Sequence, residues 1–294
     1  MAFGPLFLLL FVPSLRAQGD DDLITVDSSI VVMNASVTDS KGKAATGLDK
    51  KLFHVFEDGV EQQIGTFDAE QTPFAAVILI DTSGSMEERV SLARAAAMVF
   101  LNGLQPDDVV AVYNFDSKVE MVQDFSNSRD IRDQAYDLKA RGTTVLNDAI
   151  YKAAEILSKR QERRRAIIVL SDGADTASGK TADKAVKAAL AVNATMYTVD
   201  MSAPEGQTAG KRQNKGVLRN FAEKTGGQFI ETPGGRALRD AFGRIVEELG
   251  VLYTITYQPT NPKQDGKWRE LRLDISKPGL TIRTRKGYNG PKAK

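Results

Sequence analysis

Apolar residues follow two alternating patterns along the central part of the chain. Residues 75–80 and 166–170 are continuous apolar runs, as expected for strands that are buried on both faces of a sheet. Between such runs, apolar residues recur at the three- and four-residue spacing that is typical of helices. Segments with this helical spacing are 90–104, 129–139, 146–160, 181–192, 218–224 and 237–249. Further strands are expected at 109–115, 195–199 and 228–230, with 119–125 as an antiparallel partner. Alternating strands and helices predict an α/β fold with a doubly wound, mostly parallel sheet.

The two ends of the chain instead carry short segments that are rich in β-branched residues. The expected strands are 23–37, 53–56 and 63–67 at one end, and 253–257, 268–275 and 280–283 at the other. Asp58-Gly59 is typical of a tight hairpin. Because neither end is large enough to form a core alone, we expect both to join in one small discontinuous β-sandwich, into which the α/β domain is inserted. The expected organisation is an N-terminal β segment at 18–73, the α/β domain at 74–250 and a C-terminal β segment at 251–294.

The first 17 residues have the features of a signal peptide. Leu6–Val12 forms an apolar core that is too short to span a bilayer, Pro13 ends it, and Ala17 offers a cleavage site before Gln18. Later segments do not approach transmembrane length. We therefore expect a secreted or periplasmic protein with no membrane span once residues 1–17 are removed.

Composition and charge exclude several classes of function. The formal net charge of +1 gives no electrostatic excess for binding nucleic acid, and the basic run at 159–165 is expected to face solvent at the end of a helix. The sequence contains no cysteine, which excludes disulfides, thiol catalysis and cysteine-bound zinc. Its single histidine, His54, weakens most proposals for transition-metal centres or Ser-His-Asp triads.

Oxygen-bearing side chains follow the two buried strands at the points where each strand ends. Asp81, Ser83 and Ser85 come directly after the run 75–80, and Asp172 follows the run 166–170. In an open α/β sheet, ligands collect beyond the carboxyl ends of the strands, so these residues are expected to converge. A hard cation such as Mg²⁺ takes about six oxygen ligands, and a hydroxyl of the segment 142–148, from Thr143 or Thr144, could add one more.

These residues resemble the metal-ion-dependent adhesion site of von Willebrand factor A domains. Asp81-Thr82-Ser83-Gly84-Ser85 matches the Asp-x-Ser-x-Ser element of that family, and Asp172 matches its later aspartate. The spacing from Thr144 to Leu146 and Asp148 resembles the family's Gly-Gly-Thr-x-Leu-x-Asp segment, which selects Thr144 over Thr143. The likeness covers about residues 74–250, and one departure is that Arg141-Gly142 stands where many members have two glycines.

The flanking segments resemble secreted bacterial proteins that are described only as related to this family. The segments that carry this likeness are Phe56-Glu57-Asp58-Gly59 and Arg285-Lys286-Gly287-Tyr288. The two resemblances imply a Rossmann-like domain whose metal ligands are Asp81, Ser83, Ser85, Thr144 and Asp172.

The resemblance also implies a function. The ion would be Mg²⁺ (or Mn²⁺ or Ca²⁺), with an open coordination position that an acidic side chain of a partner protein fills. We therefore expect metal-dependent protein binding or adhesion, and not an enzyme. Two other classes stay open, a metal-assisted hydrolase and a structural assembly module without metal dependence; the oligomeric state is not predicted.

Several other residues lead to narrower expectations. The segment 203–216 contains Lys211, Arg212 and Lys215 and is expected to be a long polar loop on the metal face, either recognising an acidic partner surface or simply solvated. Asp148 is expected to support its loop. Trp268, Tyr253 and Tyr257 are expected to be core or edge residues of the sandwich.

Overall fold

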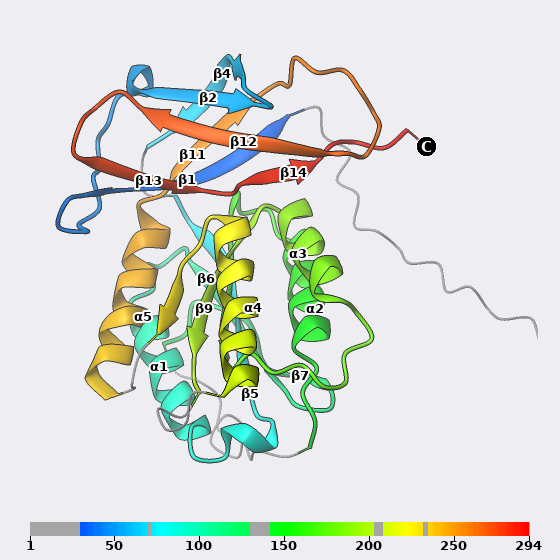
Figure 1. Ribbon diagram of the computed structural model, residues 1–294. Coiled ribbons are helices and arrows are strands. Elements are labelled where there is room, and N and C mark those ends of the chain that lie inside the picture. The colour runs from blue at the N-terminus through cyan, green and yellow to red at the C-terminus, as the bar shows by residue number, and fades with distance from the viewer. Residues whose placement is uncertain (1–29, 70–71, 130–141, 203–207, 232–234, 294) are drawn as a thin grey trace, which may run out of the picture.

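The protein consists of a helix-covered sheet and a β-sandwich stacked on one end of it (Figure 1). A computed structural model describes residues 30–69, 72–129, 142–202, 208–231 and 235–293. The expected signal peptide at 1–17 and nearly all of the expected helix at 129–139 lie outside these residues. Among the described residues, no helix is both long and apolar enough to cross a membrane.

A six-stranded sheet forms the centre of the α/β domain, in the order β10-β9-β8-β5-β6-β7. Its strands are β5 (Phe74–Asp81), β6 (Val109–Phe115), β7 (Val119–Ser126), β8 (Arg164–Ser171), β9 (Ala194–Asp200) and β10 (Phe229–Glu231). All neighbouring pairs are parallel except β6 and β7, which are antiparallel as expected. The predicted α/β fold class is therefore confirmed.

Helices cover both faces of this sheet, which explains why its central strands are continuous apolar runs. The helices are α1 (Val90–Asn102), α2 (Leu146–Ser158), α3 (Ala182–Ala191), α4 (Ala209–Thr225) and α5 (Gly235–Gly250). Along β5, Ala76 and Ile78 pack with α1 and α5 on one face, while Val77 and Leu79 pack with α2, α3 and α4 on the other. Successive side chains of a strand point to opposite faces, so every residue of β5 is buried.

The expected loop at 203–216 is wrong over its second half. Helix α4 begins at Ala209, and the Thr208 side chain caps it by accepting a hydrogen bond from Lys211 N (3.2 Å). The buried residues of α4 all lie at Leu218 or later, so its first half carries no apolar periodicity that could reveal a helix. Lys215 forms ion pairs with Asp200 and Glu231 of this chain, which leaves it a poor contact for an acidic partner.

The β-sandwich contains two four-stranded sheets, each built from both ends of the chain. Their orders are β13-β1-β11-β4 and β14-β12-β2-β3. The strands are β1 (Val31–Asp39), β2 (Phe53–Glu57), β3 (Val60–Gln62), β4 (Ile64–Asp68), β11 (Tyr253–Tyr257), β12 (Trp268–Ile275), β13 (Leu280–Thr284) and β14 (Gly287–Asn289). Strand β1 lies between β11 and β13, and β2 pairs with β12. The two ends of the chain thus complete one another, as predicted.

Details of the sandwich differ from expectation in one respect. Strand β4 does not continue the β2–β3 hairpin but crosses to the other sheet, where it pairs with β11. The core is aromatic at one end, where the rings of Phe53, Phe67 and Tyr253 lie 4.9–5.5 Å apart. Tyr253 and Tyr257 are fully buried, whereas Trp268 lies exposed on β12.

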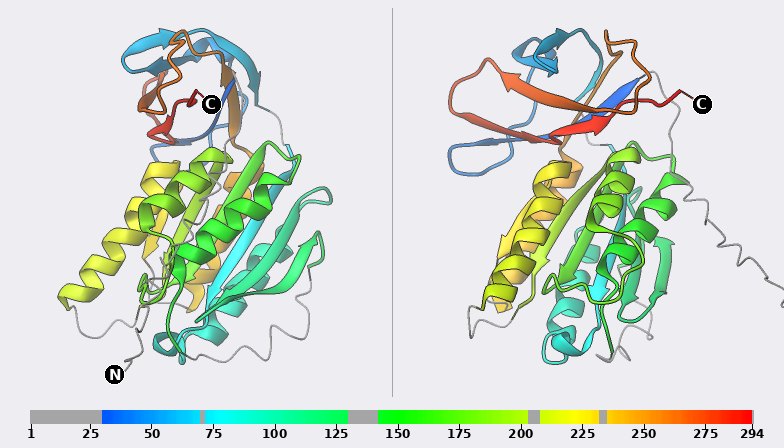
Figure 2. Two further views of the ribbon diagram at one scale, coloured as in Figure 1. Left: turned by 90° about the vertical axis from the view of Figure 1, so that its right-hand side faces the viewer. Right: turned by 45° about the vertical axis from the view of Figure 1, so that its right-hand side comes forward.

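The two chain connections between the domains meet at Arg164, the first residue of β8. Its guanidinium is fully buried and donates to the carbonyl oxygens of Thr72 (3.3 Å), Gly250 (3.0 Å) and Leu252, and to Thr254 Oγ1 (3.3 Å). Thr72 precedes β5, and Gly250 to Thr254 lead from α5 into β11. The expectation that the whole basic run 159–165 faces solvent is therefore wrong, because β8 begins directly beneath the sandwich (Figure 2).

We predict that Arg164→Met lowers the free energy of unfolding by about 3 kcal/mol or more, because it leaves several buried carbonyl oxygens without a donor. Arg163→Met is the matched control, since the Arg163 side chain is 60% exposed and pairs with Asp68 at the surface. This control should change stability by less than about 1 kcal/mol. Urea denaturation of both variants measures the difference, and equal losses would contradict the role of Arg164.

Candidate metal centre

The predicted ligands lie at the carboxyl edge of the six-stranded sheet, at the end of the α/β domain that is distant from the sandwich (Figure 1). Asp81 is the last residue of β5, and Asp172 directly follows β8, which is hydrogen-bonded to β5 along its length. Thr144 lies in the segment that leads into α2. Parallel strands that end at one edge thus bring together segments that are far apart in the sequence.

Asp81 is a fully buried carboxylate at the base of this region. Its Oδ2 accepts a hydrogen bond from Ser171 Oγ (2.6 Å), and its Oδ1 accepts one from the Ser83 backbone N–H (2.9 Å). Burial raises the pKa of Asp81 to about 6, against the lowering effect of these hydrogen bonds, and the charge of Asp172 raises it further. The carboxylate is therefore held in place but is poorly solvated.

The two serines of the Asp-x-Ser-x-Ser element follow Asp81 in the turn after β5, and their side chains are neighbours. Ser83 is buried, Ser85 is exposed, and their hydroxyl oxygens are 3.2 Å apart. The 3₁₀ helix η2 (Gly84–Met86) holds this turn, and the buried side chain of Met86 anchors it in the core. The turn thus offers two neighbouring hydroxyls, one of them at the surface.

Thr144 belongs to a loop that is hydrogen-bonded to both of the other segments. The backbone N–H of Gly84 donates to Gly142 O (3.5 Å), and the backbone N–H of Thr144 donates to Thr176 Oγ1 (2.9 Å). Thr144 is buried, whereas Thr143 is exposed, and the choice of Thr144 as a ligand stays a prediction. Gly142 has a φ of +67°, so the glycine before Thr143 serves the backbone conformation of the loop.

Asp172 and its neighbours complete the arrangement. Asp172 is half-buried, and its Oδ1 accepts a hydrogen bond from the Ala174 backbone N–H (3.0 Å). Asp148 accepts hydrogen bonds from the backbone N–H groups of Gly179 (2.9 Å) and Lys180 (2.7 Å), so it supports a loop as expected.

One residue of the site was not predicted from the sequence. Ser171 Oγ donates to Asp81 Oδ2 (2.6 Å) and accepts from the Gly173 backbone N–H (3.0 Å), which links the ends of β5 and β8. Ser171 is a single polar residue that ends an apolar strand next to a candidate ligand. Its position was the available signal, but a serine there is equally compatible with a simple strand end.

The donor set is compatible with a hard divalent cation. It combines the carboxylates of Asp81 and Asp172 with the neutral hydroxyls of Ser83, Ser85 and Thr144, and oxygen is the ligand atom that Mg²⁺ and Ca²⁺ prefer. Among the described residues, neither carboxylate has an ion-pair partner. Within these residues no three His, Cys, Asp or Glu side chains gather as a metal-binding group, but a set with only two carboxylates would not form such a group.

The single histidine lies elsewhere, in the sandwich. His54 Nδ1 is 2.8 Å from Glu61 Oε1, and its Nε2 is 2.9 Å from Ser276 Oγ. This order of groups is that of a Ser-His-Glu triad, yet all three side chains are at the surface and the Ser276 backbone N–H already donates to Leu52 O (2.8 Å), so it cannot stabilise an oxyanion. His54 is also too distant to act as a base at the candidate metal centre.

Comparison with known proteins finds a family match for part of the central domain. Residues 76–174, which include Asp81, Thr144 and Asp172, match the family of the von Willebrand factor type A domain. This part of the chain is similar to von Willebrand factor type A domains. No match was found among the curated proteins.

Solved structures with a similar fold show low sequence identity. A von Willebrand factor type A protein from Catenulispora acidiphila has a TM-score of 0.51 and 14% identity, over 91% of this chain and 75% of that one. The pilus adhesin SpaC of Lactobacillus rhamnosus GG, in its open conformation, has a TM-score of 0.50 and 11% identity, over 92% and 50%. The PilB minor pilin of Streptococcus sanguinis has a TM-score of 0.48 and 13% identity. The matched region covers 61% of this chain and 62% of the pilin's length.

We predict that the metal-free protein gains stability from Asp81 as the pH falls. The folded-state pKa is about 6 and the ordinary value is 3.8, so the folded state takes up this proton more readily than the unfolded state. The resulting stabilisation is complete below pH 3.8 and is lost as the pH rises through about 6. Relative to Asp81→Asn, the parent should gain about 2.4 kcal/mol between pH 7 and pH 4, measured by urea denaturation with a chelator. A difference that does not vary with pH would show that this carboxyl ionises as it does in water.

Proposed function

We propose that this protein binds partner proteins through a divalent cation held by Asp81, Ser83, Ser85, Thr144 and Asp172. The cation would be Mg²⁺, with Mn²⁺ or Ca²⁺ as substitutes. When bound, it would supply a positive charge with an open coordination position for an acidic side chain of the partner. The function is adhesion or assembly, without a chemical step.

The observation that carries this proposal is the buried carboxylate of Asp81, which has no ion-pair partner among the described residues and directly precedes a turn with the neighbouring hydroxyls of Ser83 and Ser85. Ser171 and the Ser83 backbone fix both carboxylate oxygens, and these bonds do not remove its negative charge. A cation at this place would relieve the cost of that charge. Because three of the five ligands are neutral, they would leave the cation with positive charge to attract a carboxylate from outside.

The position of the centre suits the binding of a large partner. The centre lies at the end of the α/β domain opposite the sandwich, so the sandwich does not obstruct it (Figure 2). The exposed hydroxyl of Ser85 marks the side from which a partner would approach.

Other lines of support come from the fold and the N-terminus. One structure that shares the fold is named a pilus adhesin, which favours a role in adhesion at the cell surface. Residues 1–17 have the pattern of a signal peptide, and we propose that the mature protein is secreted or periplasmic.

Calorimetric titration of Mg²⁺ into the metal-free protein tests the centre. We expect saturable binding that Thr144→Val weakens about tenfold or more, which corresponds to about 1.4 kcal/mol, because the change removes one hydroxyl ligand and keeps the shape of the side chain. Thr143→Val is the matched control, since it makes the same change at the adjacent, exposed position. It should alter the affinity less than about twofold.

Either of two results would count against the proposed centre. Equal effects of the two threonine variants would show that Thr144 is not a ligand. Unchanged binding in Asp172→Ala would show that the cation binds elsewhere on the protein.

Selection of displayed peptides on the Mg²⁺-loaded protein tests the proposed partner chemistry. The retained peptides should be enriched in Asp or Glu and should dissociate when a chelator is added. They should bind the Thr143→Val variant as tightly as the parent, and the Thr144→Val variant about tenfold more weakly than the parent. Retained peptides without acidic residues, or binding that survives the chelator, would contradict a carboxylate-to-metal contact.

A further inference from the structure

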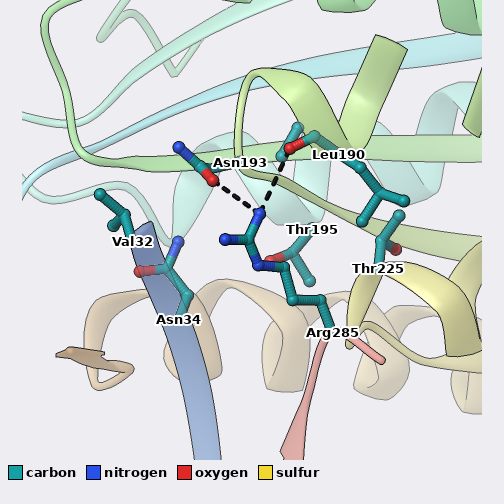
Figure 3. Close-up of a pocket in the computed structure, with 8 residues that line it drawn as sticks. Val32, Asn34, Leu190, Asn193, Thr195, Thr225 and Arg285 are labelled. Carbon is teal, nitrogen blue, oxygen red and sulfur yellow. Dashed lines mark hydrogen bonds between the residues drawn. The ribbon is translucent and has the colours of Figure 1, made fainter. Parts of the chain in front are cut away.

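A second buried charge lies at the joint between the sandwich and the α/β domain, and it has no carboxylate partner among the described residues. A small cavity there is bordered by Val32 and Asn34 of β1, by the turn from α3 to β9, and by Arg285 between β13 and β14 (Figure 3). Its volume is about 10 Å³. The cavity lies at the opposite end of the domain from the candidate metal centre, and it does not depend on the function proposed for that centre.

Arg285 is the charged group of this cavity. Its side chain is buried, with only 6% of the residue exposed, and Nη1 donates to Asn193 Oδ1 (2.8 Å) and Leu190 O (3.4 Å). Nε is buried and has no hydrogen-bond acceptor among the described residues. Nε and Nη2 form one edge of the guanidinium, and two parallel N–H groups on such an edge are the usual fork for an anion. That edge faces the side where Val32 and Asn34 lie (Figure 3).

A further donor points toward the same space. Thr254 Oγ1 accepts a hydrogen bond from Arg164 Nε (3.3 Å), so its own hydrogen is free to donate to Asn34 Oδ1 (3.1 Å). This chain fixes the orientation of the Asn34 amide, which turns its Nδ2 donor toward the guanidinium (Figure 3). The cavity is therefore lined by donors from two elements.

Within the described parts of the chain, Arg285 forms no ion pair with a carboxylate. Two features offset part of its charge: the carbonyl end of α3 at Leu190, which is the negative end of a helix dipole, and the Tyr288 ring, whose centroid lies 5.4 Å from Arg285 Cζ. Burial lowers the pKa of Arg285 to about 10, which leaves it charged at neutral pH. A water molecule in the cavity would satisfy the N–H groups but would not neutralise the charge.

We propose that this cavity binds a single small inorganic anion of the chloride type, held by the Nε–Nη2 edge of Arg285 and by Asn34 Nδ2. A volume of about 10 Å³ is at the lower limit for one water molecule, so a monatomic anion, which is slightly larger than water, is the largest anion that small side-chain shifts could admit, and sulfate and phosphate are too large. The anion contacts strand β1, the β13–β14 connection and the α3–β9 turn. It therefore stabilises the joint between the two domains.

Thermal unfolding of the full chain at constant ionic strength tests this site, with chloride replacing gluconate step by step. The melting temperature of the parent should rise by about 2–4 °C and then saturate, because the anion binds the folded state alone. The rise should be absent in Arg285→Met. Arg283→Met is the matched control on the same stretch of chain, since Arg283 pairs with Glu248 instead, and it should keep the chloride response even if its stability falls.

Asn34→Asp gives a second test that does not depend on removing the arginine. The new carboxylate would supply the missing negative charge, so this variant should melt in gluconate at or above the temperature of the chloride-saturated parent, and should not respond to chloride. A chloride effect that is linear and equal in the parent and in Arg285→Met, or an Asn34→Asp variant that is less stable than the parent in gluconate, would overturn the proposal. An equal, linear chloride effect would indicate that the cavity holds water alone. A less stable Asn34→Asp variant would indicate that a carboxylate already neutralises Arg285.

Discussion

The hydrogen bonds of the buried Arg164 guanidinium determine how the two halves of this protein fit together. The α/β domain is inserted into the sandwich, so the chain must cross from one to the other and back again. Arg164 binds the carbonyl oxygens of both crossings, at Thr72 and at Gly250 and Leu252. Because Arg164 also starts β8, the same residue connects the crossings to the central sheet. The strands that carry the candidate ligands therefore begin at a fixed place.

Each end of the α/β domain contains a buried charged side chain, and the two charges have opposite signs. At the carboxyl edge of the sheet, the carboxylate of Asp81 is buried and accepts hydrogen bonds from two donors, and it has no ion-pair partner among the described residues. At the joint, Arg285 is a buried positive charge held by two acceptors and no carboxylate from the described residues. Burying an isolated charge is costly in both cases, and an ion of opposite sign is the simplest remedy. The proposed cation site and the proposed anion site thus lie at opposite ends of the domain.

The sequence predicted those features that produce long regular patterns. The continuous apolar runs of β5 and β8 identified the buried centre of the sheet, and the polar residues after them identified the candidate ligands. The features that the sequence did not predict have local physical causes. The first half of α4 is exposed and so lacks periodicity. Arg164 is the middle one of three consecutive arginines, and Ser171 is a single polar residue at the other end of the same strand. The roles of both depend on tertiary partners that are distant in the sequence.

The direction of β5 has a mechanical consequence. The strand starts beside the sandwich and ends at Asp81, and it is hydrogen-bonded to the parallel strands β8 and β6 on its two sides. A pull between a ligand at Asp81 and the sandwich would act along the strand axis. All backbone hydrogen bonds to both neighbours would then resist in shear together, whereas a perpendicular pull would open them one after another. The insertion of the domain thus aligns a fully buried central strand with the axis of any tension between the sandwich and a partner bound at the opposite edge of the sheet.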